Sequence, residues 1–141
     1  MKYVALVLSA FFLISCHTEP QPLVVGKDEC YFCKMPVADI KFGGEIITAK
    51  GKLYKFDDLG CMINFLKRMT GDKKAEQMLG VNYNNQKLID VQKAVFLKNP
   101  NLHSPMNSGI AVFASRSEAE PMMKDSASEI LTWQQLYPDS N

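Results

Sequence analysis

Two thiols and a thioether lie within six residues of this chain, in the segment Cys30-Tyr31-Phe32-Cys33-Lys34-Met35. Soft sulfur donors at this density select soft metal ions, above all Cu(I). Zinc sites use thiolate, imidazole and carboxylate ligands and do not recruit thioethers, so Met35 favours copper over zinc. This segment constrains the chain more than any other, and it predicts a copper site with Cys30, Cys33 and Met35 as candidate ligands.

The N-terminus predicts export and lipid attachment. Lys2 precedes an apolar run from Val4 to Leu13, and Leu13-Ile14-Ser15-Cys16 has the residue order of a bacterial lipobox. The run is too short to span a bilayer comfortably, so we expect a signal peptide over residues 1–15 that is cleaved before Cys16. Cys16 would then be acylated, and several acyl chains hold a protein at a membrane far more firmly than one. An ordinary secretory signal with an incidental Cys is the alternative, and it exports the protein as well.

The residue after Cys16 is His17 and not Asp, which favours sorting to the outer membrane, with the protein facing the periplasm. Removal of residues 1–15 from the 141-residue chain leaves 126 residues, a length that suits one domain with its own core. Lys2 is removed with the signal, so 15 basic side chains balance 15 acidic ones, and no basic arm or stripe for nucleic acid remains. Residues 16–27 contain two prolines and lack periodicity, which predicts a flexible tether. A single metal-binding domain is expected over residues 28–141.

The cysteines leave two alternatives to a copper site open. With Cys16 acylated, three thiols remain, and they cannot all pair within one chain. A disulfide between Cys30 and Cys33 would make the chain a structural or interaction lipoprotein. A zinc-stabilised module could use Cys30, Cys33, Cys61 and His103, although it lacks the second closely spaced ligand pair of a convincing zinc site. With only two His, and neither a nucleophile elbow nor a phosphate loop, the chain is not expected to be an enzyme.

Two parts of the chain have a strand, strand, helix order. In the first, residues 45–50 and 53–56 predict a hairpin around Gly51-Lys52. A helix follows, capped by Asp57 or Asp58. The apolar stripe of that helix consists of Leu59, Met62, Ile63, Leu66 and Met69. Cys61 lies on the flank of the stripe, where a buried, inert Cys is the favoured interpretation.

A polar, Asn-rich connection over residues 82–86 leads to the second part. There we expect strands at 88–91, 94–98 and 110–114, a short helix over 115–125 capped by Ser117, an extended segment at 129–133 and a final turn at 134–137. The fold class is therefore α+β, with two ββα-type halves that share a core and mainly antiparallel strands with helices packed on them.

A second methionine-bearing loop lies between the strands of the second half. Met106 is surrounded by Ser, Pro, Asn and Gly residues, so it has no helix or strand face to pack on and is a candidate metal ligand. His103 could add an imidazole or be an ordinary loop histidine, and the ordinary interpretation is favoured.

Together these segments resemble the nitrous-oxide-reductase accessory lipoproteins, the NosL family. The resemblance rests on residues 30–35, 56–62, 104–113 and 129–133, and it extends over most of the chain from residue 28 to residue 136. It implies a membrane-anchored Cu(I)-binding chaperone that takes copper from an upstream donor or transporter. Its client would be nitrous oxide reductase, during assembly of the copper-sulfide centre of that enzyme.

Matched position by position, the resemblance implies that Cys33, Met35 and Met106 are copper ligands, and Cys30 could be a fourth donor. Two positions depart from the family pattern, because Lys34 and Asn107 stand where many members have Gly. Neither departure removes a donor atom.

Overall fold

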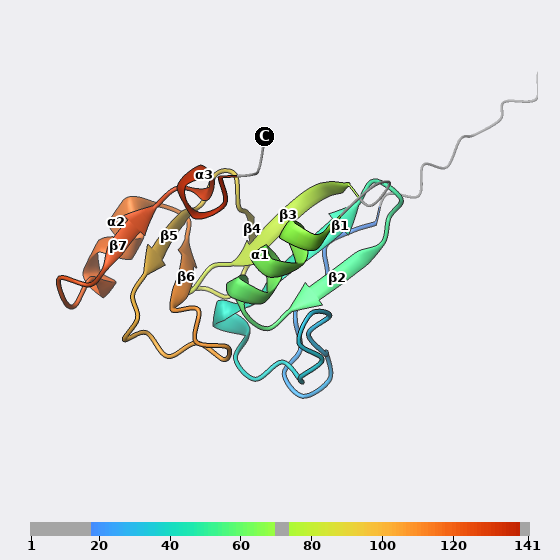
Figure 1. Ribbon diagram of the computed structural model, residues 1–141, viewed down its shortest axis with the longest axis horizontal. Helices are drawn as coiled ribbons and strands as arrows, with labels where there is room; N and C mark the ends of the chain where they lie inside the picture. The colour runs from blue at the N-terminus through green and yellow to red at the C-terminus, as the bar shows by residue number, and fades with distance from the viewer. Residues whose placement is uncertain (1–17, 70–73, 139–141) are drawn as a thin grey trace, which may run out of the picture.

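Two antiparallel sheets carry the fold of the computed structural model, which describes residues 18–69 and 74–138 (Figure 1). The predicted signal peptide and Cys16 lie outside the described residues. The first sheet has the strand order β2-β1-β3-β4, and the second has the order β6-β5-β7. Every strand pair within these two sheets is antiparallel. The α+β class predicted from the sequence is confirmed.

The elements have the following bounds. The strands are β1 (Gly44–Thr48), β2 (Leu53–Phe56), β3 (Ala75–Val81), β4 (Leu88–Asp90), β5 (Val95–Lys98), β6 (Ile110–Phe113) and β7 (Glu129–Leu131). The helices are α1 (Leu59–Arg68), α2 (Arg116–Ala119) and α3 (Trp133–Leu136), with short 3-10 turns η1 (Ile40–Phe42) and η2 (Glu120–Met122).

The first half contains the predicted hairpin and helix together with a strand that the sequence analysis missed. Strands β1 and β2 pair through Gly44↔Phe56 to Ile47↔Leu53, and Gly51 in the turn has the positive φ of 75° that glycine favours. Strand β3 follows α1 and pairs along the other edge of β1, which makes β1 central. The first residues of β3 are small or polar, so their sequence does not resemble a strand.

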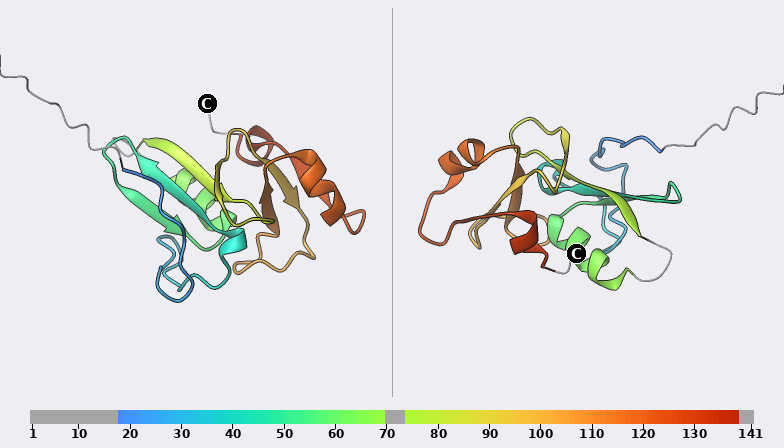
Figure 2. Two further views of the ribbon diagram at one scale, coloured as in Figure 1. Left: turned by 180° about the vertical axis from the view of Figure 1, so that it is seen from behind. Right: turned by 90° about the horizontal axis from the view of Figure 1, so that it is seen from above.

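Helix α1 lies across one face of the first sheet and joins the two halves in one core (Figures 1 and 2). Asp58, and not Asp57, caps the helix, because its carboxylate accepts a hydrogen bond from Gly60 N–H at 2.7 Å. The predicted stripe is buried from Leu59 to Leu66. It packs with Phe96, Val112 and Trp133 of the second half, and each such large apolar side chain contributes about 1.5–3 kcal/mol by burial.

The second half is shorter in its helical part than predicted. The helix expected over 115–125 is α2, a single turn that continues into η2 at Pro121. Its cap is Ser115 and not the predicted Ser117, because the Ser115 hydroxyl accepts a hydrogen bond from Glu118 N–H. The extended segment predicted at 129–133 is β7, and the final turn is α3.

Residues 18–27 lie against the sheet face opposite α1 (Figure 2). Leu23 is buried with Val37 and Val81, and Gln21 N–H donates a hydrogen bond to the Glu45 carboxylate at 3.1 Å. The Thr18 hydroxyl donates to the carbonyl of Gly51 at 2.8 Å. These contacts begin before residue 28, where the sequence analysis starts the domain. The sequence analysis missed them because they are made by single side chains of an extended segment, which produce no periodic pattern.

Candidate metal centre

Residues 30–35 form a closed loop whose ends are joined by backbone hydrogen bonds. Cys30 N–H donates to the carbonyl of Met35 at 2.8 Å, and Lys34 N–H donates to the carbonyl of Cys30 at 2.9 Å. Closing the loop requires a positive φ of 65° at Lys34, a conformation that glycine adopts at no cost and a lysine does not. Lys34 is one of the two positions at which many members of the resembled family have Gly. The chain therefore keeps the loop shape without the glycine.

Aromatic packing fixes this loop against β2 and α1. Tyr31 N–H donates to the carbonyl of Lys55 at 2.8 Å. The Tyr31 ring contacts the rings of Tyr54 and Phe65, with centroids 4.5 and 5.4 Å away. Edge-to-face pairs of this kind add about 0.5–1.5 kcal/mol beyond their burial. The thiols on either side of Tyr31 are thus held in a defined place relative to α1.

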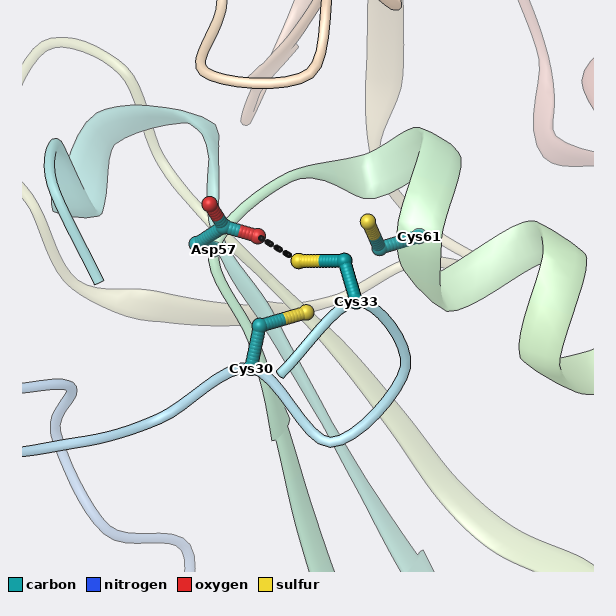
Figure 3. A group of neighbouring side chains, drawn as sticks. All are labelled: Cys30, Cys33, Asp57 and Cys61. Atoms are coloured by element: carbon teal, nitrogen blue, oxygen red, sulfur yellow. Dashed lines mark hydrogen bonds between the residues drawn. The ribbon is translucent and has the colours of Figure 1, made fainter. Parts of the chain in front are cut away.

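Four side chains converge between the loop and the start of α1, as Figure 3 shows. One ligand atom from each of Cys30, Cys33, Asp57 and Cys61 lies within 4.8 Å of the other three. The Cys33 thiol donates a hydrogen bond to an oxygen of Asp57 at 3.7 Å between sulfur and oxygen. Cys30 and Cys61 are buried, and Cys33 is half-buried. Cys30, Cys33 and Cys61 are free thiols in this structure, so the disulfide between Cys30 and Cys33, one of the two alternatives to a copper site, is not formed in it.

Cys61 and Asp57 are members of this group that the sequence analysis did not favour. Cys61 lies in the first turn of α1, and Asp57 lies at the junction of β2 and α1. A usable signal was the pair of adjacent acids before the helix, since only one of them can cap it and the other is left for a different role. The four-donor set also differs from that of the zinc module considered as an alternative, because Asp57 takes the place of His103, which is exposed.

The thiols and the carboxylate influence one another's ionisation. A hydrogen bond from Cys61 lowers the pKa of Cys30, which makes Cys30 the first thiol to ionise. The same interaction and burial raise the pKa of Cys61, and burial raises the pKa of Cys33. Burial, together with hydrogen bonding to Cys30 and its negative charge, raises the pKa of Asp57 to about 7. The group therefore holds one thiolate readily and keeps further protons that a bound metal would displace.

The Met106 loop is attached to the start of α1. Met106 N–H donates to the second carboxylate oxygen of Asp58 at 3.0 Å. Within the loop, the Ser104 hydroxyl accepts from Gly109 N–H, and Asn107 has a positive φ of 56°. Asn107 is the second position where many family members have Gly, and Asn tolerates this conformation better than most residues. Ser108 packs closely on α1, because a Cβ added at Gly60 would lie 2.8 Å from the Cβ of Ser108.

The predicted ligands differ in how deeply they are buried. Met35 and Met106 are 53% and 42% exposed, on two separate loops. Cys33 is half-buried beside Asp57, and Cys30 is fully buried. The structure brings Cys30 and Cys33 together with Cys61. It places the two thioethers on loops that are hydrogen-bonded to, or lie beside, the adjacent pair Asp57 and Asp58.

The NosL family model matches residues 23–141. The chain belongs to the NosL family. Its fold is similar to that of the crystal structure of the copper chaperone NosL from Shewanella denitrificans, with a TM-score of 0.69 and 16% sequence identity. That likeness covers 84% of this chain and 95% of the other, and at this identity it shows a shared fold. No curated protein sequence matches the chain.

Membership of the NosL family confirms the resemblance seen in the sequence. The NosL match starts at residue 23, so Leu23 and the segment after it belong to the family domain.

Proposed function

We propose that this NosL-family protein binds Cu(I) and hands it to a copper enzyme. The observation that carries the proposal is the meeting of soft donors at the start of α1, where Cys33 lies beside two further thiols and two loops present exposed thioethers. The shared fold with the copper chaperone NosL from Shewanella denitrificans supports it.

Cys33, Met35 and Met106 are the proposed ligands of the copper that is transferred, and Cys30 is a fourth donor. Cu(I) is stable with two or three soft ligands, so a thiolate and two thioethers hold it and leave room for a ligand from the partner. Because Met35 and Met106 are exposed, a partner protein can replace them one at a time. Copper then moves by ligand exchange and is never released as a free ion.

The proposed client is nitrous oxide reductase, whose copper-sulfide centre needs copper during assembly, and the proposed source is an upstream copper donor or transporter. The NosL family membership supports this choice. Deleting this protein should yield a reductase that is produced but lacks copper at that centre. A fully loaded reductase in the deletion strain would point to another client.

The proposed location is the periplasmic face of the outer membrane, through acylation of Cys16. No helix among the described residues is long and apolar enough to cross a membrane. Cys16→Ser should move the protein from the membrane fraction to the soluble fraction of the cell envelope. A protein that stays in the membrane fraction after this change would exclude the lipid anchor.

The ligand assignment is tested by Cu(I) affinity in competition with a chromogenic Cu(I) chelator, without oxygen. Cys33→Ala should abolish tight Cu(I) binding. Met35→Leu and Met106→Leu each remove one sulfur atom and keep the apolar bulk of the side chain, so they test the thioether itself. A Met123→Leu variant is the matched control, since Met123 is also exposed, at 40%, but lies outside the proposed site. Wild-type affinity in Cys33→Ala would refute its assignment.

A zinc-stabilised module is the second candidate. It is favoured by one observation, namely that three thiols and a carboxylate within 4.8 Å also form a four-donor set that zinc accepts. In that case zinc would raise the melting temperature strongly, and substitution of Met35 or Met106 would change nothing.

A further inference from the structure

We propose that Cys30, Cys33 and Cys61 form a second, buried Cu(I) position behind the exposed position made by Cys33, Met35 and Met106. This inference rests on the proposed copper function and adds to it a retention site with a ligand, Cys61, that the family resemblance does not supply.

The first argument is the order of burial. The thioethers of Met35 and Met106 belong to side chains that are 53% and 42% exposed. Cys30 and Cys61 are 0% and 3% exposed. Cys33 is half-buried, between these extremes. Soft donors are therefore graded from solvent to interior, and Cys33 is the donor that both positions share.

The second argument is distance. The three sulfur atoms, each one ligand atom of the group, lie within 4.8 Å of one another. Metal–thiolate bonds of about 2.3 Å, the length found in zinc sites, would place three sulfurs in a plane about 4 Å apart. Only a small contraction of the group is needed to surround one ion. Figure 3 shows the sulfurs of Cys30 and Cys33, on the loop, and that of Cys61, on α1, gathered in one place.

The third argument is that the two inner donors are held by the fold before any metal binds. Both backbone hydrogen-bonding groups of Cys30 are used within its own loop, at 2.8 and 2.9 Å. Cys61 lies in the capped first turn of α1, between the buried residues Leu59 and Met62. Donors placed in advance lose little conformational freedom when the ion arrives, which strengthens binding.

The two positions divide the work of a chaperone. Thioethers need no deprotonation, so capture of Cu(I) from a donor protein at the outer position releases one proton only, that of the Cys33 thiol. Exchange of the thioethers for the thiolates of Cys30 and Cys61 then moves the ion inward, with each thiol releasing its proton to solvent. Copper stays Cu(I) throughout. In the inner position the ion is shielded from solvent and from chelators until a client draws it back through Cys33.

The test compares Cys61→Ala with Ile63→Val, a matched control on the same helix that removes a buried methylene but no sulfur. Cu(I)-loaded protein is mixed with a bulky chromogenic chelator without oxygen, and affinity and release rate are measured. Loss of a group that only supports a metal ligand already costs about 10–100-fold in affinity, so we expect Cys61→Ala, which removes a ligand, to bind Cu(I) at least tenfold more weakly and to release it faster by a similar factor. Ile63→Val should match the wild type. Equal values for Cys61→Ala and wild type would overturn the inner position.

A double variant, Met35→Leu with Met106→Leu, keeps the test valid if Cys61→Ala does not fold, because both substituted side chains are exposed. It should still bind one Cu(I), with X-ray absorption showing sulfur ligands only. Complete loss of binding in this variant would overturn the inner position. If the wild-type protein itself bound no Cu(I), the proposed function would fail as a whole, which separates the two outcomes.

Discussion

Asp58 links the start of α1 to the Met106 loop, because one carboxylate oxygen accepts a hydrogen bond from Gly60 N–H at 2.7 Å and the other accepts from Met106 N–H at 3.0 Å. The preceding residue, Asp57, accepts a hydrogen bond from the Cys33 thiol. Two adjacent carboxylates thus connect segments that are 24 and 48 residues away along the chain. The position of the proposed ligands relative to one another depends on this pair.

Asp58→Ala should lower both stability and copper affinity. The side chain is fully buried and makes two hydrogen bonds, and loss of a helix cap alone costs about 0.5–2 kcal/mol. The Met106 loop would lose its attachment, so Cu(I) affinity should fall as well. Urea unfolding and chelator competition measure the two effects. Unchanged affinity in a folded Asp58→Ala protein would show that Met106 does not need this bond.

The Lys34→Gly variant of the protein should be more stable than the Lys34→Ala variant. The Lys34 ammonium lies 4.1 Å from the centroid of the Tyr31 ring. Both substitutions remove this contact, so its loss is the same in the two variants. Only alanine keeps a Cβ at a φ of 65°, which costs about 1 kcal/mol. We therefore expect Lys34→Gly to exceed Lys34→Ala by about 1 kcal/mol in unfolding free energy. Equal stability of the two variants would argue against the loop conformation.

Glu45 should make stability depend on pH. This carboxyl is 0% exposed in β1, and burial raises its pKa, partly offset by Gln21 N–H and Lys55. A carboxyl whose pKa is raised in the folded state stabilises the fold fully below its unfolded pKa, and this stabilisation is lost as pH rises through the folded pKa. Glu45→Gln stays neutral and keeps an acceptor for Gln21. Its unfolding free energy relative to wild type should therefore rise as the pH increases above the unfolded pKa of Glu, about 4.3.

Urea unfolding of Glu45→Gln and wild type below and above that pH measures the difference. Glu29→Gln is the control, since it makes the same chemical change at an exposed position. A difference between Glu45→Gln and wild type that is constant with pH would contradict the raised pKa.

The proposed lipid anchor should orient the domain on the membrane. Thr18 is hydrogen-bonded to Gly51 in the β1–β2 turn, and two residues of extended chain span at most about 7 Å, so an anchor attached two residues before Thr18 would hold this turn near the lipid. The Cys30–Met35 loop is bonded near the other end of β2 (Figure 1). In vesicles of brominated lipid, a tryptophan at Lys50→Trp should be quenched in the lipidated protein. One at Met35→Trp should not, and equal quenching at both positions would contradict this orientation.

Those parts of the fold that are encoded by local pattern could be predicted from the sequence. The β1–β2 hairpin follows from Gly51 between two β-rich runs, and α1 follows from its apolar stripe. Strand β3 could not be predicted, because its stability comes from pairing with β1 and its first residues are small or polar. The packing of residues 18–27 was hidden for a similar reason, since it depends on partners in the sheet.

The candidate site divides in the same way. Cys30, Cys33 and Met35 are neighbours in sequence, and their chemistry is visible without a structure. Cys61 and Asp57 join them only because the loop packs on the start of α1, which no local pattern encodes. The adjacent acids before α1 were the one local hint. They become informative only when it is known that Asp58 is the cap.

One titration tests the central claim most directly. The reduced protein, produced from residue 17 onward, is titrated with Cu(I) in competition with a chromogenic chelator, and the titration is repeated with zinc. The account predicts tight one-to-one Cu(I) binding, weak zinc binding, and loss of Cu(I) binding in Cys33→Ala. Failure to compete with the chelator for Cu(I), or a preference for zinc, would contradict it.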